Sequence, residues 1–238
     1  MVKKILATAV AVTALTAGSA NAAVITLDSV SGIWTDASPL AAVSGFNTNE
    51  ISWGDPATNN GPSSYRFDGE APPPVPVSLN TTFELGTFTH SNFPVFPPSL
   101  TSAELTVTSD LTIDGSPEQV ISIFNFSHLE STNSDDPCAN GDSNGVGVNV
   151  NGCADRVTFD LNAASSDVFT VAGVDYQLDI AGFLYQDVLA DEFWTMEEQN
   201  NQAELRGIIT ASARVPEPAT LTLLGLGLLG MGMRRSRA

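Results

Sequence analysis

The segment between residues 23 and 214 contains no lysine. Its only basic side chains are Arg66, Arg156, Arg206 and Arg214, which stand against 26 carboxylates. Nucleic-acid binding depends on neutralising phosphates with lysine and arginine, and anionic lipid headgroups make the same demand. The composition therefore argues against a nucleic-acid partner and rules out lysine-based covalent catalysis in this segment. It suits contact with cations or a hydrated matrix, or it simply keeps the protein soluble.

The sequence also lacks the short motifs that mark common enzyme classes. It has no Gly-x-Ser-x-Gly turn, no phosphate-binding loop and no dinucleotide-binding fingerprint. Two acids for glycoside cleavage cannot be chosen among so many carboxylates, because that reaction depends on their separation in space. We therefore assign no catalytic residue and expect no enzymatic activity.

The first 22 residues have the three parts of a secretory signal. Lys3 and Lys4 precede an uncharged apolar run of about 14 residues, and Ala20-Asn21-Ala22 supplies the small residues of a cleavage site. The run is shorter than the roughly 20 residues that a membrane-spanning helix needs. We predict a signal peptide over 1–22, cleaved after Ala22 during export.

The last 25 residues, 214–238, also have three parts. Pro216-Glu217-Pro218 is followed by an uncharged apolar run from Ala219 to Met233 and then by an arginine cluster at 234–237. The basic end favours a cytoplasmic C-terminus. We expect the apolar run to form a short transmembrane helix that enters the membrane transiently.

This tail resembles the PEP-CTERM sorting signal, over about 24 residues and in the order tripeptide, apolar helix, arginine cluster. The resemblance implies that an exosortase of a Gram-negative bacterium recognises the tail and processes it near Pro216-Glu217-Pro218. It also implies a location at the cell surface or in the extracellular matrix, in cells that make exopolysaccharide and biofilm. An ordinary tail anchor is the alternative.

Cys138 and Cys153 are the only cysteines of the chain. In an exported protein an even number of cysteines indicates a disulfide. Closing a loop of roughly 15 residues would stabilise the fold by about 3 kcal/mol in the chain-entropy model. Two cysteines with no histidine nearby make a poor zinc site, so we predict the Cys138–Cys153 disulfide.

The segment between the two ends has the patterns of β-strands. The clearest strand, 103–113, alternates polar residues with Leu105, Val107, Leu111 and Ile113. Further strands are expected at 25–30, 49–53, 83–89, 120–128, 156–160, 167–172, 174–184 and 205–213. A short helix is expected only within 185–202. Many strands separated by turns favour a mainly β chain with one β-sandwich or jelly-roll-like domain over residues 23–213.

The two histidines, His90 and His128, occur in similar local sequences. His90 lies two residues after a phenylalanine and two residues before Asn92. His128 likewise lies two residues after a phenylalanine and two residues before Glu130. In strands these residues share one face. On neighbouring strands, the imidazoles and Glu130 could form a two-histidine, one-carboxylate metal site, as in a metal-dependent hydrolase. The alternatives are a structural role at strand ends and general acid–base catalysis.

Residues 89–95, Thr-His-Ser-Asn-Phe-Pro-Val, resemble the signature of the THxN family of PEP-CTERM proteins. Residues 128–133 resemble the second histidine-containing segment of that family. Trp34, the Trp53-Gly54-Asp55-Pro56 segment and the loop between the cysteines agree with its layout. The resemblance covers most of the segment between the two ends, and it implies a relationship without implying an activity.

The loop between the cysteines is rich in oxygen-bearing side chains. The candidate calcium ligands are Asp135, Asp136, Asn140, Asp142 and Asn144. The 140-142-144 spacing with Gly145 resembles a calcium loop, but Asn140 replaces the first aspartate and Asn151 stands where a bidentate glutamate belongs. A turn tied by the disulfide is the alternative, since such residues are common in turns. No other cofactor is predicted.

Exposed aromatic rings can stack on sugars, and the candidates are Trp34, Trp53, Tyr65 and Trp194; core packing is the alternative for each. The leading functional hypothesis is an exported, exosortase-sorted surface or matrix protein in contact with exopolysaccharide. Its partners would be the export machinery and the exosortase. A carbohydrate- or calcium-binding module and a metal-dependent hydrolase remain alternatives.

Overall fold

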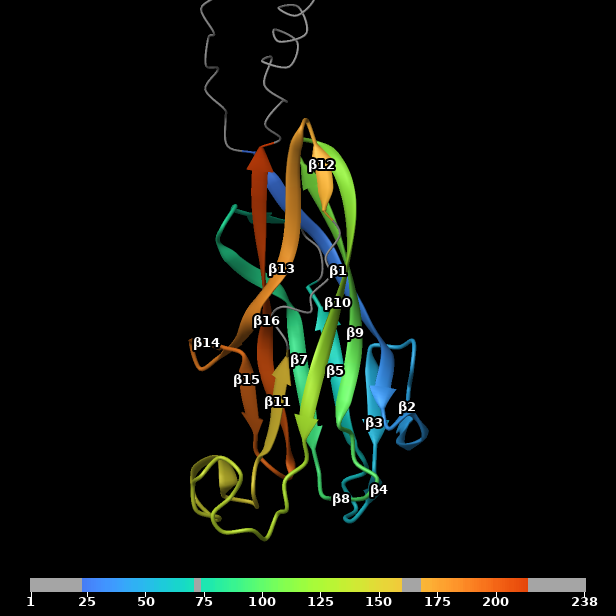
Figure 1. The fold of residues 1–238 in the computed structure, drawn as a ribbon, viewed down its shortest axis with the longest axis vertical. Coiled ribbons are helices and arrows are strands. Elements are labelled where there is room, and N and C mark those ends of the chain that lie inside the picture. Colours follow the sequence, from blue (N-terminus) through green and yellow to red (C-terminus); the bar gives the residue numbers. More distant parts are fainter. Residues whose placement is uncertain (1–22, 71–73, 160–167, 214–238) are drawn as a thin grey trace, which may run out of the picture.

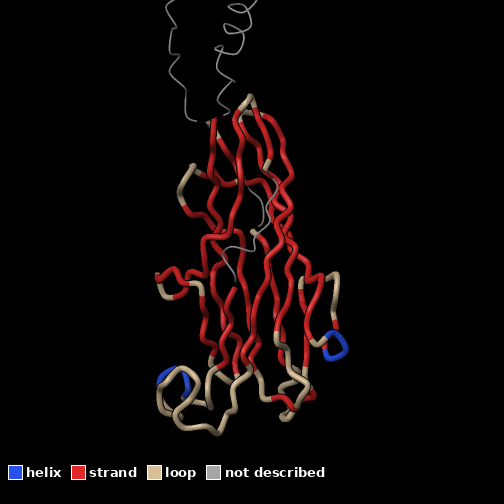
Figure 2. Tube along the Cα trace, viewed as in Figure 1, coloured by secondary structure: helices blue, strands red, loops and turns tan. Residues whose placement is uncertain are grey.

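The computed structural model describes residues 23–70, 74–159 and 168–213. Most of these residues are in β-strands, and the helical segments among them are two short 3-10 turns, η1 (Leu40–Ala42) and η2 (Gly147–Asn149) (Figure 2). The predicted mainly β class is confirmed. Within the described residues, no helix has the length and apolar character needed to cross a membrane. The predicted signal peptide and the predicted sorting helix lie outside these residues.

Two large antiparallel sheets make up the fold (Figure 1). The first has six strands in the order β15 (Glu192–Thr195), β11 (Asp155–Phe159), β10 (Ser116–Leu129), β9 (Ser102–Ile113), β1 (Ile25–Ser38) and β6 (Val75–Val77). The second has the order β12 (Phe169–Val171), β13 (Val174–Tyr185), β16 (Gln199–Ala213), β7 (Thr82–Asn92), β5 (Ser63–Gly69), β3 (Glu50–Trp53) and β2 (Val43–Ser44), with β14 (Val188–Ala190) paired to β13. A small ribbon joins β4 (Asp55–Pro56) and β8 (Val95–Phe96).

The alternating pattern of 103–113 corresponds to β9, whose apolar residues are buried at every second position as predicted. A two-residue turn, Asp114-Gly115, joins β9 to β10, and both turn residues have positive φ. Such a turn matches the twist of the flanking strands, so it fixes their register from Ile113↔Ser116 onward. Strands β1, β7 and β16 extend well beyond their predicted ranges, and β5 was not predicted at all.

The helix predicted within 185–202 is wrong. The segment forms β14, β15 and the start of β16. Gln186 and Asp187 both have positive φ, which turns the chain tightly between β13 and β14 and ends any helix there. Strand β15 then pairs with β11, and its residues Phe193 and Thr195 face the interior.

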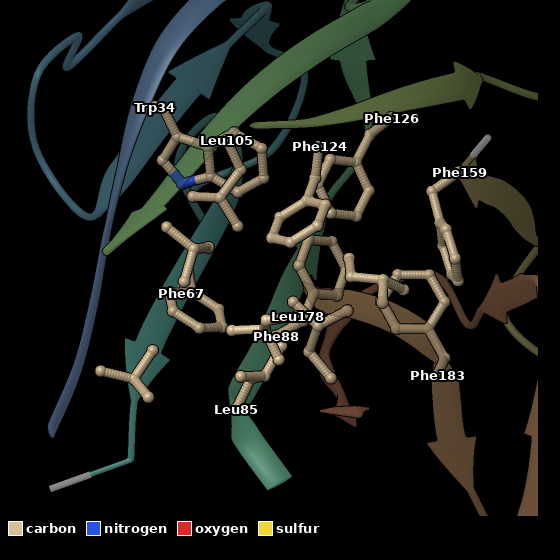
Figure 3. Close-up of a cluster of buried hydrophobic side chains, with 14 of the residues drawn as sticks. Trp34, Phe67, Leu85, Phe88, Leu105, Phe124, Phe126, Phe159, Leu178 and Phe183 are labelled. Carbon is tan, nitrogen blue, oxygen red and sulfur yellow. The ribbon is translucent and has the colours of Figure 1, made fainter. Parts of the chain in front are cut away.

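The core lies between the two sheets and is rich in aromatic rings. Phe88 of β7 stacks on Phe126 of β10, with ring centroids 5.6 Å apart and an interplanar angle of 7°. Phe183 of β13 lies 5.3 Å from Phe88. In Figure 3, the rings from β7 and β13 of the eight-stranded sheet point toward Phe124 and Phe126 of the six-stranded sheet. Burial of such large rings is the main force holding the two sheets together.

The two ends of the molecule differ. Strand β1 begins and β16 ends at the upper end in Figure 1. Strands β7 and β10 end, and β11 begins, at the lower end, where residues 130–154 form a long loop. Strand β16, the last described strand, therefore ends opposite to that loop.

Replacing Phe88 by alanine tests this core. Phe88 is 0% exposed, whereas Phe96 of the β4–β8 ribbon is 58% exposed. We expect Phe88→Ala to lower the free energy of unfolding by about 3–5 kcal/mol, because it leaves a cavity between the sheets. Phe96→Ala should change it by less than about 0.5 kcal/mol. Urea denaturation measures both, and equal effects would contradict the proposed core.

Candidate functional site

A group of buried polar side chains fills the lower end of the interior, where the aromatic core stops. The eight-stranded sheet contributes His90 and Asn92 of β7 and Tyr65 of β5. The six-stranded sheet contributes His128 of β10, Asp155 of β11 and Thr195 of β15. All six are buried. Glu130 and Glu197 come from the segments that follow β10 and β15. We call these eight residues the polar centre.

The two histidines lie against each other. Their ring centroids are 5.3 Å apart, with the rings nearly perpendicular. The sheets bring them together because His90 is near the end of β7 and His128 is near the end of β10, on facing layers. The two histidines therefore meet across the interior from facing sheets, and not on neighbouring strands as the sequence suggested. The distance leaves their chemical role open.

His90 is held by Thr195. The His90 Nδ1 atom lies 2.9 Å from Thr195 Oγ1, and that hydroxyl lies 3.2 Å from the main-chain oxygen of Asp155. A carbonyl oxygen can only accept, so the threonine proton goes to Asp155 and His90 Nδ1–H donates to Thr195. The remaining nitrogen, Nε2, then carries a lone pair. It is buried and has no hydrogen-bond partner.

His128 is held by Tyr65. The Tyr65 hydroxyl lies 2.6 Å from His128 Nδ1. The other nitrogen, His128 Nε2, faces two carboxylates: Glu130 Oε2 at 3.4 Å and Asp155 Oδ2 at 3.9 Å. Trp53 stacks beside His90 and makes an edge contact with His128, which seals this side of the polar centre from water.

Asp155 and Glu197 are fully buried carboxylates. Asp155 Oδ1 accepts a hydrogen bond from the main-chain N–H of Ser131 at 2.7 Å, while Oδ2 has no hydrogen-bond partner. Neither carboxylate oxygen of Glu197 has a hydrogen bond of ordinary geometry, although the Asn133 and Asn92 amides lie near enough to lower its pKa. Carboxylates buried with so few partners are costly.

Burial dominates the electrostatics of the polar centre. It raises the pKa of Asp155 well above its usual range, and the charge of Glu130 adds to the effect. Burial and the charge of Glu130 raise the pKa of Glu197 to about 7. Burial lowers the pKa of His90, and His128 lowers it further. Perturbed groups gathered in this way are typical of functional sites.

No described basic side chain neutralises these carboxylates. Among the described residues, Arg66 pairs with Asp68 and Arg206 pairs with Glu204. The Arg156 guanidinium lies over the Trp194 ring, 5.7 Å from its centroid. Arg156 follows Asp155 on β11, so the alternation of a strand points it to the other face.

The loop of residues 130–154 closes over the polar centre. The predicted disulfide is confirmed, with Cys138 and Cys153 bonded and their Cα atoms 5.3 Å apart. Asn151 Nδ2 donates to the main-chain oxygen of Glu197 at 3.1 Å. Ser131 contacts Asp155, as described above. Both ends of the loop are thus attached to the polar centre, and the disulfide joins one of these ends to the middle of the loop.

The proposed calcium ligands hold the loop's own shape. Asn140 and Asn149 pair through their side-chain amides. Asn144 Nδ2 donates to the main-chain oxygens of Asn133 and Asp135 at 2.8 and 3.0 Å, and Asn144 N–H donates to Asp136. Asp142 accepts from Cys138 N–H through its main-chain oxygen. The two groups of converging imidazole and carboxylate donors found among the described residues lie in the polar centre instead. Calcium binding by this loop stays a prediction.

Sequence reasoning named His90, Asn92, His128 and Glu130, and the structure brings these four together. It missed Asp155, Glu197, Tyr65 and Thr195 as members of the polar centre. The available signal was slight: Asp155 is a charged residue at the start of a strand whose inward positions are otherwise apolar. Glu197 lies in a turn, and nothing local distinguishes it from the other acids.

Three of the four aromatic candidates for sugar stacking are core residues, which corrects that expectation. Trp34, Trp53 and Tyr65 are at most 1% exposed. The fourth, Trp194, lines a groove of about 490 Å³ together with Tyr185, Glu192 and Val188. Tyr185 is 43% exposed, and the Trp194 indole N–H donates to Glu192 at 3.2 Å. The groove is thus the accessible aromatic surface near the polar centre.

Comparison with known proteins bears on the tail alone. The PEP-CTERM protein-sorting motif matches residues 214–237. The motif implies an exosortase-processed protein that is exported and associated with the cell envelope. The chain therefore carries a PEP-CTERM sorting signal, the kind of signal that an exosortase processes. No curated protein matches the chain.

Thr195→Val tests how strongly the hydroxyl holds the polar centre. Valine keeps the shape of threonine but cannot accept from His90 or donate to Asp155. We expect the free energy of unfolding to fall by about 1–3 kcal/mol, because buried polar atoms lose their partners. Thr158→Val, a half-buried change on neighbouring β11, serves as the control, with an expected effect within about 0.5 kcal/mol. Urea denaturation compares them, and equal effects would contradict this bonding scheme.

Proposed function

We propose that the protein works at the surface or in the extracellular matrix of a Gram-negative bacterium, in contact with exopolysaccharide and without catalysing a reaction. The observation that carries the proposal is the PEP-CTERM motif at residues 214–237. The lysine-free, acidic composition of residues 23–214 supports it, because such a segment stays soluble in a hydrated matrix and avoids nucleic acid.

The proposal includes three processing steps and a domain boundary. The signal peptide 1–22 is removed during export, the tail 214–238 enters the membrane transiently, and an exosortase processes it near Pro216-Glu217-Pro218. The working part is one domain, residues 23–213. The two facing sheets and their shared aromatic core support a β-sandwich architecture for it.

Membership of the THxN family is part of the proposal. The residues of its signature, His90 and Asn92, both point into the polar centre, and so does His128 of the second segment. Because the polar residues of the motif are buried together, we expect them to occur together in related proteins. That supports a shared construction among such proteins.

Carbohydrate binding is the second candidate function, and the Trp194 groove favours it. Trp194 and Tyr185 offer ring faces for stacking on a sugar, and Glu192 offers a hydrogen-bond acceptor for its hydroxyls. The apolar residues Val188 and Leu189 beside the groove are 61% and 46% exposed. Aromatic faces flanked by a carboxylate suit a neutral glycan better than an acidic one.

Changing Pro216-Glu217-Pro218 to three alanines in the producing cells tests the sorting proposal. We expect the altered protein to keep the mass of its tail and to stay with the cell membrane, because the exosortase no longer recognises it. A strain without the exosortase should give the same product from the natural sequence. Intact-mass measurement and cell fractionation provide the readout. Unchanged processing of the triple variant would contradict the proposal.

A glycan array tests the groove. We expect the purified protein to bind a subset of neutral glycans, and Trp194→Ala to weaken that binding about tenfold, the worth of one ring stacked on a sugar. Phe96→Ala removes an exposed ring elsewhere and should leave binding unchanged. Absence of any bound glycan, or equal binding by both variants, would rule out this function for the groove.

A further inference from the structure

We propose that His90, His128 and Asp155 bind one divalent transition-metal ion inside the lower end of the fold. Each of the three offers one ligand atom, and these atoms lie within 4.8 Å of one another. Metal–ligand bonds of about 2.0–2.2 Å place donors roughly 3–4 Å apart, so small side-chain adjustments suffice. This site is independent of where the protein is sorted.

The unpaired atoms are the strongest observation. His90 Nε2 and Asp155 Oδ2 are buried and have no hydrogen-bond partner in the polar centre. Buried polar atoms are nearly always satisfied, and an exception calls for an explanation such as an ion. A cation between the two atoms would satisfy both of them at once, and His128 Nε2, 3.9 Å from Asp155 Oδ2, completes the set.

The hydroxyl groups that contact the two imidazoles are those that a metal site needs. Metal-bound histidines generally donate their second ring N–H to an oxygen, which fixes the tautomer and the ring orientation. Thr195 accepts from His90 Nδ1–H, as argued above, and Tyr65 lies 2.6 Å from His128 Nδ1. His128 Nε2 is thereby directed toward the carboxylates, and His90 Nε2 is left with an unused lone pair.

The charge balance also favours a cation. Asp155, Glu130 and Glu197 form a second group of donor atoms within 4.8 Å of one another, with Asp155 common to both groups. No described lysine or arginine lies among them. A divalent ion would neutralise Asp155 and one neighbouring glutamate, and Glu197 or Glu130 would supply the fourth ligand. Glu130, with its side chain 19% exposed, marks the side open to solvent.

The ligand types indicate the class of metal. Imidazole nitrogen suits zinc, copper, iron and nickel, whereas calcium and magnesium prefer sites made of oxygen alone. The ligands come from β7 of one sheet and from β10 and β11 of the other. The bound ion would therefore join the two sheets directly and fix the loop that the disulfide closes.

Zinc binding by the protein as its host exports and processes it, purified without chelators, tests the site. We expect about one zinc ion per chain by elemental analysis. Removal with EDTA should lower the melting temperature by about 5 °C or more, and added Zn²⁺ should restore it. Cobalt should replace zinc and give the visible absorption bands of a four-coordinate ion. No bound ion and a melting temperature indifferent to EDTA and Zn²⁺ would overturn the proposal.

Two carboxylate-to-amide variants locate the ion. Asp155→Asn removes a proposed ligand, and Asp55→Asn makes the same change at an exposed position of β4. We expect Asp155→Asn to weaken zinc affinity at least 100-fold, and Asp55→Asn to leave it unchanged. If Asp155→Asn does not fold, His90→Gln answers the same question, because its cobalt spectrum can be compared with that of the natural protein. Zinc retained by both Asp155→Asn and His90→Gln would place the ion elsewhere and overturn the proposal. An unchanged cobalt spectrum in His90→Gln would do the same.

Discussion

Two fully buried carboxylates that pair with none of the described arginines are the constraint on which the lower end of the molecule depends. Asp155 and Glu197 are removed from water, and the described arginines are engaged elsewhere. Such groups are kept only if protons or a cation compensate them. The surrounding residues are arranged around these two carboxylates. Two imidazoles lie beside them, and two hydroxyls orient the imidazoles. The loop closed by the disulfide covers the polar centre.

The fold explains how residues so far apart in sequence meet. The aromatic core fills the space between the sheets and excludes water up to the end of β7 and β10. At that point His90 and His128 take the place of the phenylalanine rings. The polar centre therefore borders directly on the water-free, apolar core. The centre lies at the end of the fold opposite to the end of β16.

Part of this could be predicted from sequence because the signals are local. Period-two alternation identified β9, and an even cysteine count identified the disulfide. The repeated Phe-x-His pattern placed each histidine on the same face as the phenylalanine before it. The PEP tripeptide with its apolar run and arginines identified the tail. Each of these signals is contained within a few neighbouring residues.

The rest depended on tertiary contacts. Asp155 and Glu197 are two of the 26 acids between residues 23 and 214. Asp155 is buried because β11 lies between β10 and β15 and turns this residue inward. Glu197 is buried where the chain crosses from β15 of one sheet to β16 of the other. Residues 185–202 suggested a helix because the turn at Gln186-Asp187 has no glycine or proline to mark it. Trp34, Trp53 and Tyr65 gave no local sign that they pack inward, since an aromatic ring suits a core and a binding surface equally well.

An anomalous-difference map from a crystal of the protein grown with zinc, measured at the zinc edge, would test the central claim most directly. The account predicts one peak in the polar centre, about 2.0–2.2 Å from His90 Nε2, His128 Nε2 and a carboxylate oxygen of Asp155. A fully ordered polar centre without such a peak, with Asp155 and Glu197 hydrogen-bonded to each other or to water, would contradict it.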